Sequence, residues 1–123
     1  MRGLRLKSGT RNKYGAVRTK VDGIKFDSKA EARRYGELKL LERGGYIREL
    51  KIHPSYPIHY PRYRLEQIPE DCFICTVELD FSYFDNKDGQ YHHEDVKGRD
   101  NRLSMLKRKL VEVRYNIKVE IIK

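Results

Sequence analysis

The chain has 123 residues, of which 37% are charged and 38% are hydrophobic, and it contains nine Tyr and four Phe. This length suits one domain with one core, and the aromatic content argues against a disordered chain. We see no apolar stretch of membrane-spanning length and no signal peptide, so we expect a cytoplasmic protein. The two Cys residues do not indicate a disulfide framework.

The net charge is +9, and the excess lies mainly in two stretches, residues 1–20 and 97–109. The first stretch contains no acidic residue. A strongly basic balance is typical of proteins that bind a polyanion, most often nucleic acid. We therefore predict a flexible basic arm over residues 1–20 and one folded domain over residues 21–123. The residues predicted to contact DNA are Arg2, Arg5, Lys7, Arg11, Lys13, Arg99, Arg102, Lys107 and Lys109.

The first clear element is a helix that begins after Ser28, a good N-cap residue, and ends at the glycines 44–45. Its predicted buried stripe consists of Tyr35, Leu38 and Leu41. Residues 46–52 then alternate enough to predict a strand. Four Pro residues between positions 54 and 70 make regular structure doubtful there.

The strongest predicted strand covers residues 72–84. Turn-forming residues follow at 86–89, and residues 91–97 form the partner strand of a hairpin. A second helix is predicted over residues 100–114, and residues 117–122 form a final strand. The predicted buried stripe of this helix consists of Leu103, Leu106, Leu110 and Val113. This order of elements predicts an α/β fold with a mixed sheet flanked by helices.

The pattern acid-x-Lys occurs five times in the chain and is therefore weak evidence alone. On a strand its two side chains share one face. A metal-dependent phosphodiesterase needs this pair, because the carboxylate holds a cation while the ammonium orients water or offsets charge. Only Glu49–Lys51 and Asp95–Lys97 fall on predicted strands.

A second acid favours the pair Asp95–Lys97. Asp80 lies in the middle of an otherwise apolar strand, and the predicted hairpin brings it opposite Glu94, with an uncertainty of about one residue. Two adjacent carboxylates repel each other unless a cation or a proton lies between them. Glu49 has no comparable partner.

Glu31 has two possible roles. With Ser28 it matches a capping box, in which its carboxylate accepts a hydrogen bond from the N-cap amide. It also lies on the predicted buried side of the helix with Tyr35 and Leu38. A first-turn carboxylate that faces the sheet can complete a metal site, and the residues alone leave both roles open.

These motifs together resemble the PD-(D/E)xK nuclease superfamily, and in particular a phage-encoded family of small nucleases similar to archaeal-type Holliday junction resolvases. The matching segments are Asn12–Gly15, Val21–Tyr35, Leu79–Tyr83, Glu94–Gly98 and Leu106–Leu110. The resemblance implies that residues 21–123 form a restriction-endonuclease-like core, with the element order αβββαβ. The Pro-Asp of the superfamily is Leu79-Asp80 here.

The resemblance also implies a role for each motif residue. Asp80 and Asp95 would be metal ligands, helped by the backbone carbonyl of Val96 and by Glu31, and Lys97 would position the attacking water. Lys107 and Lys109 would contact phosphates near the cleaved bond. The expected ion is Mg²⁺, with Mn²⁺ as a substitute, because oxygen ligands suit both. The implied partners are branched DNA and a second copy of the chain, in the cytoplasm of a bacterial host, without membrane or small-molecule cofactor.

Other interpretations remain open at this point. A zinc site could use Cys72 and Cys75 with the histidines 92–93, although Cys residues three apart on a strand face opposite sides. His93 shares a strand face with Asp95 and could contact DNA. Aromatic and basic residues also alternate between positions 56 and 64, where they could stack on unpaired bases or pack a loop onto the sheet. These residues are Tyr56, Tyr60, Arg62, Tyr63 and Arg64.

Two further functions compete with a junction resolvase. One is a sequence-specific or nicking nuclease of the same superfamily, which a shared fold and active site do not separate from a resolvase. The other is a basic DNA-binding protein without catalytic activity, which would gain nothing from clustered carboxylates that face phosphate.

Overall fold

The computed structural model describes residues 18–59 and 72–123. Its elements, in chain order, are β1 (Thr19–Val21), β2 (Ile24–Phe26), α2 (Lys29–Arg43), β3 (Ile47–Ile52), β4 (Ser55–His59), β5 (Phe73–Glu78), β6 (Phe81–Asp85), β7 (Gln90–Val96), α3 (Arg102–Tyr115) and β8 (Val119–Ile122). Both helices lie where the sequence predicts them. The protein therefore has a mixed α/β fold.

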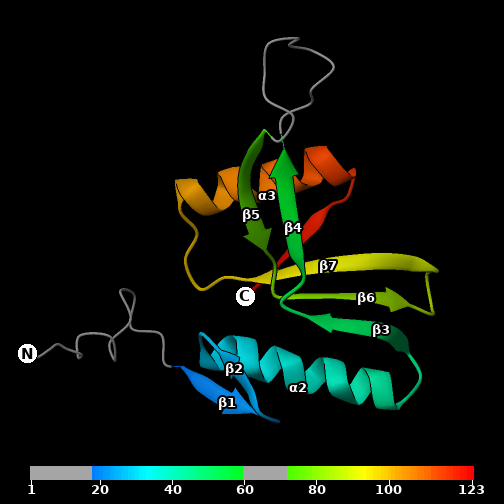
Figure 1. The fold of residues 1–123 in the computed structure, drawn as a ribbon. Helices are drawn as coiled ribbons and strands as arrows, with labels where there is room; N and C mark the ends of the chain where they lie inside the picture. Colours follow the sequence, from blue (N-terminus) through cyan, green and yellow to red (C-terminus); the bar gives the residue numbers. More distant parts are fainter. Residues whose placement is uncertain (1–17, 60–71) are drawn as a thin grey trace, which may run out of the picture.

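A four-stranded sheet with the order β3-β6-β7-β8 forms the centre of the fold. β6 runs antiparallel to both β3 and β7, whereas β7 and β8 are parallel. A parallel pair needs a long crossover connection, and α3 provides it. Figure 1 shows the sheet between α2 with the β1–β2 hairpin on one side and α3 with the β4–β5 hairpin on the other.

Each side of the sheet has its own apolar core. On the α2 side the buried cluster consists of Phe26, Tyr35, Leu38, Ile47, Phe81 and Tyr83. On the α3 side it consists of Ile58, Val77, Leu79, Val111 and Val119. The fold therefore has two small cores rather than the single core expected from its length. The chain must pass from one to the other between Leu79 and Phe81.

The short β1–β2 hairpin was not predicted. Its turn residues Asp22 and Gly23 have φ values of +53° and +78°. Two successive residues with positive φ are typical of the type I′ turn, for which Asp-Gly is a preferred sequence. Thr19 and Lys20, which we placed in the flexible arm, thus belong to β1.

The prediction of one continuous strand over residues 72–84 is wrong. The chain bends at Leu79 and Asp80, so β5 pairs with β4 outside the central sheet while β6 lies within it. The opposite strand bends at the same level: Leu79 N–H donates to the Pro54 carbonyl over 3.0 Å, and His53 N–H donates to the Asp80 carbonyl over 2.9 Å. The two strands therefore leave the sheet together as one bent ribbon.

The doubt about regular structure after Pro54 is also wrong for residues 55–59, which form β4. β4 contains Pro57, and among the described residues it pairs with β5 alone. An edge strand tolerates proline, because one side of its backbone needs no donor. The remainder of this Pro-rich segment, residues 60–70, lies outside the described residues.

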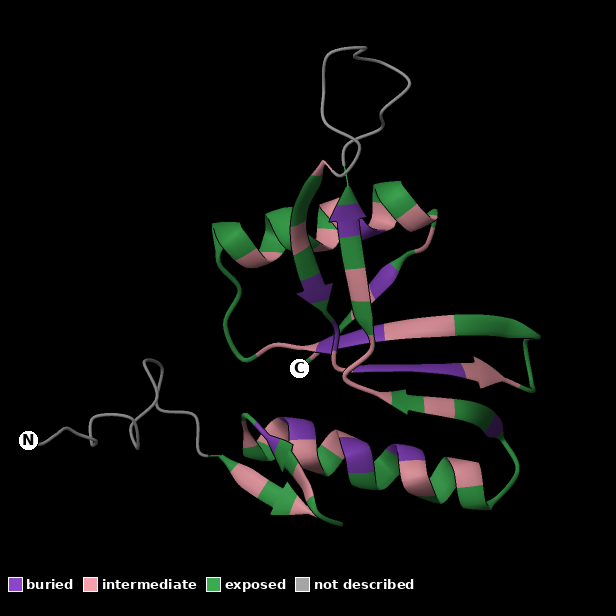
Figure 2. Cartoon of the chain, in the orientation of Figure 1, coloured by how far each residue is buried: buried purple, intermediate pink, exposed green. Residues whose placement is uncertain are grey.

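The predicted buried stripes of both helices need correction. Leu103, Leu106 and Val113 of α3 are 61%, 56% and 75% exposed, whereas Val111 is fully buried. The helix is rotated by about one residue from the predicted orientation, so Arg108 rather than Lys107 or Lys109 faces the sheet. In α2, the buried residues are Glu31, Tyr35 and Leu38, and Leu41 is exposed. Figure 2 shows the exposed positions along both helices.

Candidate functional site

Asp80 lies at the bend between β5 and β6, where the backbone is held from two sides. Its N–H donates to the Glu94 carbonyl over 3.1 Å, and its carbonyl accepts a hydrogen bond from His53. Its side-chain oxygen Oδ2 accepts a hydrogen bond of 2.6 Å from the backbone N–H of Val96. The bend thus fixes both the backbone and one carboxylate oxygen of Asp80. The prediction that Asp80 lies beside the 94–97 segment is confirmed.

Glu31 forms one half of the predicted capping box, and its role at a metal site stays a prediction. Ser28 Oγ accepts a hydrogen bond of 3.1 Å from the Glu31 N–H, as in a capping box. The Glu31 carboxylate, however, accepts through Oε2 from the N–H of Asp27 over 3.2 Å rather than from Ser28. Its other oxygen, Oε1, lies 2.7 Å from Nε2 of His53. Although Glu31 is only 4% exposed, one of its oxygens binds the residue before the N-cap while the other faces His53.

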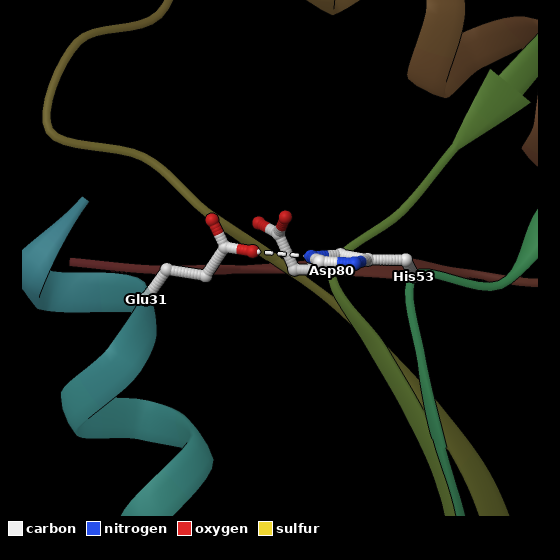
Figure 3. A group of neighbouring side chains, drawn as sticks. All are labelled: Glu31, His53 and Asp80. Carbon is white, nitrogen blue, oxygen red and sulfur yellow. Dashed lines mark hydrogen bonds and ion pairs between the residues drawn. The ribbon is translucent and has the colours of Figure 1, made fainter. Parts of the chain in front are cut away.

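Glu31, His53 and Asp80 form a cluster with the composition of a metal site (Figure 3). One donor atom from each residue lies within 4.8 Å of the other two. The three residues come from the first turn of α2, the end of β3 and the bend before β6. The bent ribbon therefore places two of the three donors, and the helix N-terminus adds the third.

The electrostatics of Asp80 favour a bound positive charge. Burial raises the pKa of Asp80 to about 8, with further increases from the Glu31 and Asp95 carboxylates and a partial offset from the Val96 N–H. A carboxyl group with this pKa favours its protonated form at neutral pH. A divalent cation replaces that proton with a stronger positive charge, so the surroundings of Asp80 suit a divalent cation.

Asp95 and Lys97 lie next to this cluster and contact each other. The Lys97 ammonium is 3.3 Å from Asp95 Oδ2, and the Arg108 guanidinium approaches the same oxygen at 3.8 Å. Arg108 also forms a two-bond ion pair with Asp100. Two cationic groups thus face the Asp95 carboxylate, whereas Asp80 has mainly other carboxylates around it.

A cleft of about 520 Å³ opens over Glu31 and Asp80. Its lining residues are Asp27, Ser28, Ala30, Glu31, Asp80, Val96, Lys97, Gly98 and Arg99. The cleft therefore exposes three acids and two basic residues to a ligand. Val96 also lines the cleft. The role of its backbone carbonyl as a metal ligand stays a prediction.

The predicted DNA-contacting residues divide into two groups. Arg2, Arg5, Lys7, Arg11 and Lys13 lie outside the described residues. Of the others, Arg99 lines the cleft, and Arg102, Lys107 and Lys109 are exposed in α3. Arg108, which the sequence analysis did not choose, is the helix residue that reaches Asp95.

Sequence reasoning missed three important side chains. His53 follows a strand and precedes Pro54, and no spacing pattern connects it to an acid. Arg108 could have been found from Ser104 and Val111, which share its helix face at spacings of four and three. Glu94 was seen only as a neighbour of Asp80. It is 1% exposed and accepts hydrogen bonds from Arg34 and Tyr83, which neutralise it away from the cleft.

The zinc interpretation receives no support from the described residues. Cys72 and Cys75 are free thiols, and neither belongs to a metal-type cluster within residues 18–59 and 72–123. His92 instead joins Asp85 and Asp88 in a second cluster, at the far end of the hairpin. His93 is hydrogen-bonded through Nδ1 to the Tyr56 hydroxyl over 3.1 Å.

Tyr56 packs against His93 and Tyr115, with ring centroids 6.2 and 5.2 Å away. Tyr56 therefore joins β4 to the sheet and to α3. This contact matches the alternative in which the aromatic residues of this segment pack onto the sheet. The other residues of that aromatic and basic segment, at positions 60 to 64, lie outside the described residues.

Fold and site together define a basic mixed α/β protein with a clustered carboxylate–histidine site. The family described as "Protein of unknown function (DUF1064)" matches residues 11–123, so the chain belongs to this family. No curated protein and no solved structure matches the chain. Neither helix among the described residues has the length and apolar character needed to cross a membrane.

Proposed function

We propose that this protein is a metal-dependent endonuclease that hydrolyses phosphodiester bonds in branched DNA, with the four-way junction as its main substrate. One observation carries the proposal. Asp80 is held at a strand bend beside two other carboxylates, with its pKa raised to about 8, in a cleft that also contains Lys97. Clustered carboxylates repel one another and are unfavourable in a folded protein unless a cation offsets that repulsion.

The arrangement of the elements supports the same proposal. Without the two hairpins, the order is α2, β3, β6, β7, α3 and β8, which is the αβββαβ order expected for a PD-(D/E)xK core. The β4–β5 ribbon is then an insertion between the first two strands of that core. Asp80, at the bend before β6, and the Asp95–Lys97 pair, at the end of β7, support this proposal because they lie on neighbouring segments of that core.

Glu31 and Asp80 would hold the cation, and Asp95 lies within reach of Asp80. A bound divalent cation stabilises negative charge on the phosphate and generates or orients a water nucleophile. Lys97, placed by its contact with Asp95, would position that water or offset charge on the transferring phosphoryl group. Val96 holds Asp80 through its N–H, which keeps the carboxylate at the cleft.

The charge and size of the chain favour recognition of DNA shape over recognition of bases. The net charge of +9 supplies phosphate contacts, which position DNA without reading its sequence. A chain of 123 residues leaves little room for loops that read bases. Branched DNA offers a distinctive shape to such a surface.

Cleavage of a four-way junction on two strands requires two active sites, so we propose that the protein acts as a homodimer. The exposed leucines of α3, Leu103 and Leu106, provide apolar surface for such contact. Sedimentation analysis of the wild type should show a dimer, and Leu106→Glu should shift it toward the monomer. A monomeric wild type bound to the junction would contradict the dimer.

A cleavage assay tests the proposed activity. The protein would be mixed with end-labelled four-way junction, linear duplex of the same sequence and single-stranded DNA, each with Mg²⁺, Mn²⁺ or EDTA. We expect paired incisions in the junction that depend on the cation. Equal cutting of linear duplex would favour a sequence-specific or nicking nuclease. Binding without cleavage of any substrate would favour the non-catalytic DNA-binding protein.

A further inference from the structure

His53 occupies an unusual backbone position. Its φ value is +54°, in the left-handed region that non-glycine residues rarely adopt, and it immediately precedes Pro54. A residue before proline normally prefers an extended conformation. The bent ribbon maintains the unusual conformation, because the His53 N–H donates to the Asp80 carbonyl over 2.9 Å. This backbone conformation places the imidazole beside two acids.

Among the described residues of the cluster, the imidazole has one close polar partner. Its Nε2 lies 2.7 Å from Oε1 of Glu31, and Figure 3 shows both side chains beside the Asp80 carboxylate. Its ring also packs near Phe26, with ring centroids 5.7 Å apart. Phe26 belongs to the α2-side core, so apolar packing limits the rotation of the ring. His53 is thus oriented by contacts on two sides.

The three donors differ in chemistry, which matters for the choice of ion. Glu31 and Asp80 offer carboxylate oxygens, whereas His53 offers a neutral nitrogen. The next carboxylate, Asp95, is already shared with Lys97 and Arg108. The cluster within 4.8 Å therefore contains two oxygen donors and one nitrogen donor instead of the all-oxygen set implied by the nuclease motif.

We propose that His53 is a protein ligand of the cation at this site and that its nitrogen makes the site favour a first-row transition metal ion over Mg²⁺. This inference rests on the proposed metal-dependent function. Mg²⁺ strongly prefers oxygen ligands in a regular octahedral arrangement, whereas imidazole suits transition metal ions. Binding would replace the contact between Glu31 and His53 with contacts from both side chains to the ion.

The test uses Mn²⁺ as the probe and His53→Asn as the variant. Asn tolerates the left-handed conformation and offers an amide oxygen where His offers a nitrogen. The matched control is His92→Asn, which removes the imidazole of the second cluster, with Asp85 and Asp88. Two quantities are measured on each protein: the ratio of Mn²⁺ to Mg²⁺ affinity by competition titration, and nitrogen coupling to bound Mn²⁺ by pulsed EPR.

We expect nitrogen coupling in the wild type and in His92→Asn, and its loss in His53→Asn. The Mn²⁺ to Mg²⁺ affinity ratio should fall by about tenfold or more in His53→Asn and stay unchanged in the control. Coupling that persists in His53→Asn, or an unchanged ratio, would overturn the proposal. Labelling only the histidines with ¹⁵N provides the same test in the wild-type chain, so it does not depend on the folding of the variant.

The failure of this inference and the failure of the proposed function give different results. If the wild type cleaves DNA with a bound cation but shows no imidazole coupling, His53 is not a ligand and the nuclease proposal stands. If Mn²⁺ binds with imidazole coupling but no DNA is cleaved with any ion, the ligand assignment stands and the nuclease proposal fails.

Discussion

Asp80, at the bend before β6, and Glu94, in β7, are joined by a backbone hydrogen bond of 3.1 Å, yet their surroundings differ. Glu94 accepts two hydrogen bonds from the Arg34 guanidinium, at 2.8 and 2.6 Å, and one of 2.5 Å from the Tyr83 hydroxyl. Asp80 accepts one backbone N–H and faces the carboxylates of Glu31 and Asp95.

The difference shows that burial alone does not identify a functional acid. Glu94 is the more buried residue, but its charge is neutralised within the protein, and its hydrogen bond raises the pKa of Arg34 well above its ordinary value. The charge of Asp80 is not neutralised by the residues around it. An acid whose partners are other acids is the better candidate for a cation site.

The largest expected effect is the loss of DNA cleavage when an acid of the proposed site loses its charge. Asp80→Asn and Asp95→Asn should each reduce single-turnover cleavage of a four-way junction by at least about a hundredfold, because metal stabilisation of charge is worth several kcal/mol. Junction binding should be retained, since the basic residues are untouched. Asp88→Asn, in the exposed hairpin turn, is the control and should cleave normally. Normal cleavage by Asp80→Asn would contradict the site.

The free energy of unfolding should depend on Glu94 and its partner Arg34, which cleavage does not require. Arg34→Met leaves Glu94 buried without its cation, and we expect a loss of about 2–3 kcal/mol in the free energy of unfolding. Arg34 also contacts Glu37, which is exposed, so Glu37→Gln is the control and should cost less than about 1 kcal/mol. Urea unfolding in EDTA measures both. Equal losses would show that the pair with Glu94 has no special role.

The pH dependence of stability provides a third comparison. The pKa of Asp80 is about 8 in the folded protein and 3.8 ordinarily, so the folded state binds the proton more tightly than the unfolded state. In EDTA, this group therefore stabilises the fold most fully below pH 4, and that contribution is lost as the pH rises toward 8. Urea unfolding at several pH values should show a smaller fall for Asp80→Asn than for the wild type. Parallel curves would contradict the raised pKa.

Glu31→Gln should have the smallest effect of the four predictions. Glutamine keeps an oxygen that can accept from Asp27 N–H, so the helix cap and thermal stability should change little. The loss of charge should still lower the affinity for Mn²⁺ and slow cleavage by about tenfold. Thermal melting and cleavage rates separate the two roles. Unchanged cleavage would assign Glu31 to the cap alone.

Local patterns predicted the helices well, because their signals lie in neighbouring residues. Ser28 accepts its capping hydrogen bond, and α2 ends at Gly44 as expected. The bend at Asp80 was not predictable in this way, since the apolar residues on both sides of it continue the strand pattern. It depends on the opposite strand, where His53 adopts a left-handed conformation before Pro54. Predicting this bend therefore requires the segments around His53 and Asp80 to be considered together.

The orientation of α3 shows a similar limit. Its sequence contains two overlapping apolar stripes, one through Leu106 and one through Val111, and periodicity alone does not choose between them. The structure buries Val111, and Arg108 on the same side reaches Asp95 and Asp100. Spacing along the chain was enough to find the acids and Lys97. It was not enough to find His53 or Arg108, whose partners are distant in sequence.

The proposed cation site at Asp80 is tested most directly by an anomalous difference map from crystals of the protein soaked with Mn²⁺. We predict a peak between the carboxylates of Glu31 and Asp80, beside His53, and no peak at Glu94. The same soak of Asp80→Asn should lack that peak. A map with density only at the second cluster, formed by Asp85, Asp88 and His92, or at neither cluster, would contradict a cation site at Asp80 and with it the proposed nuclease.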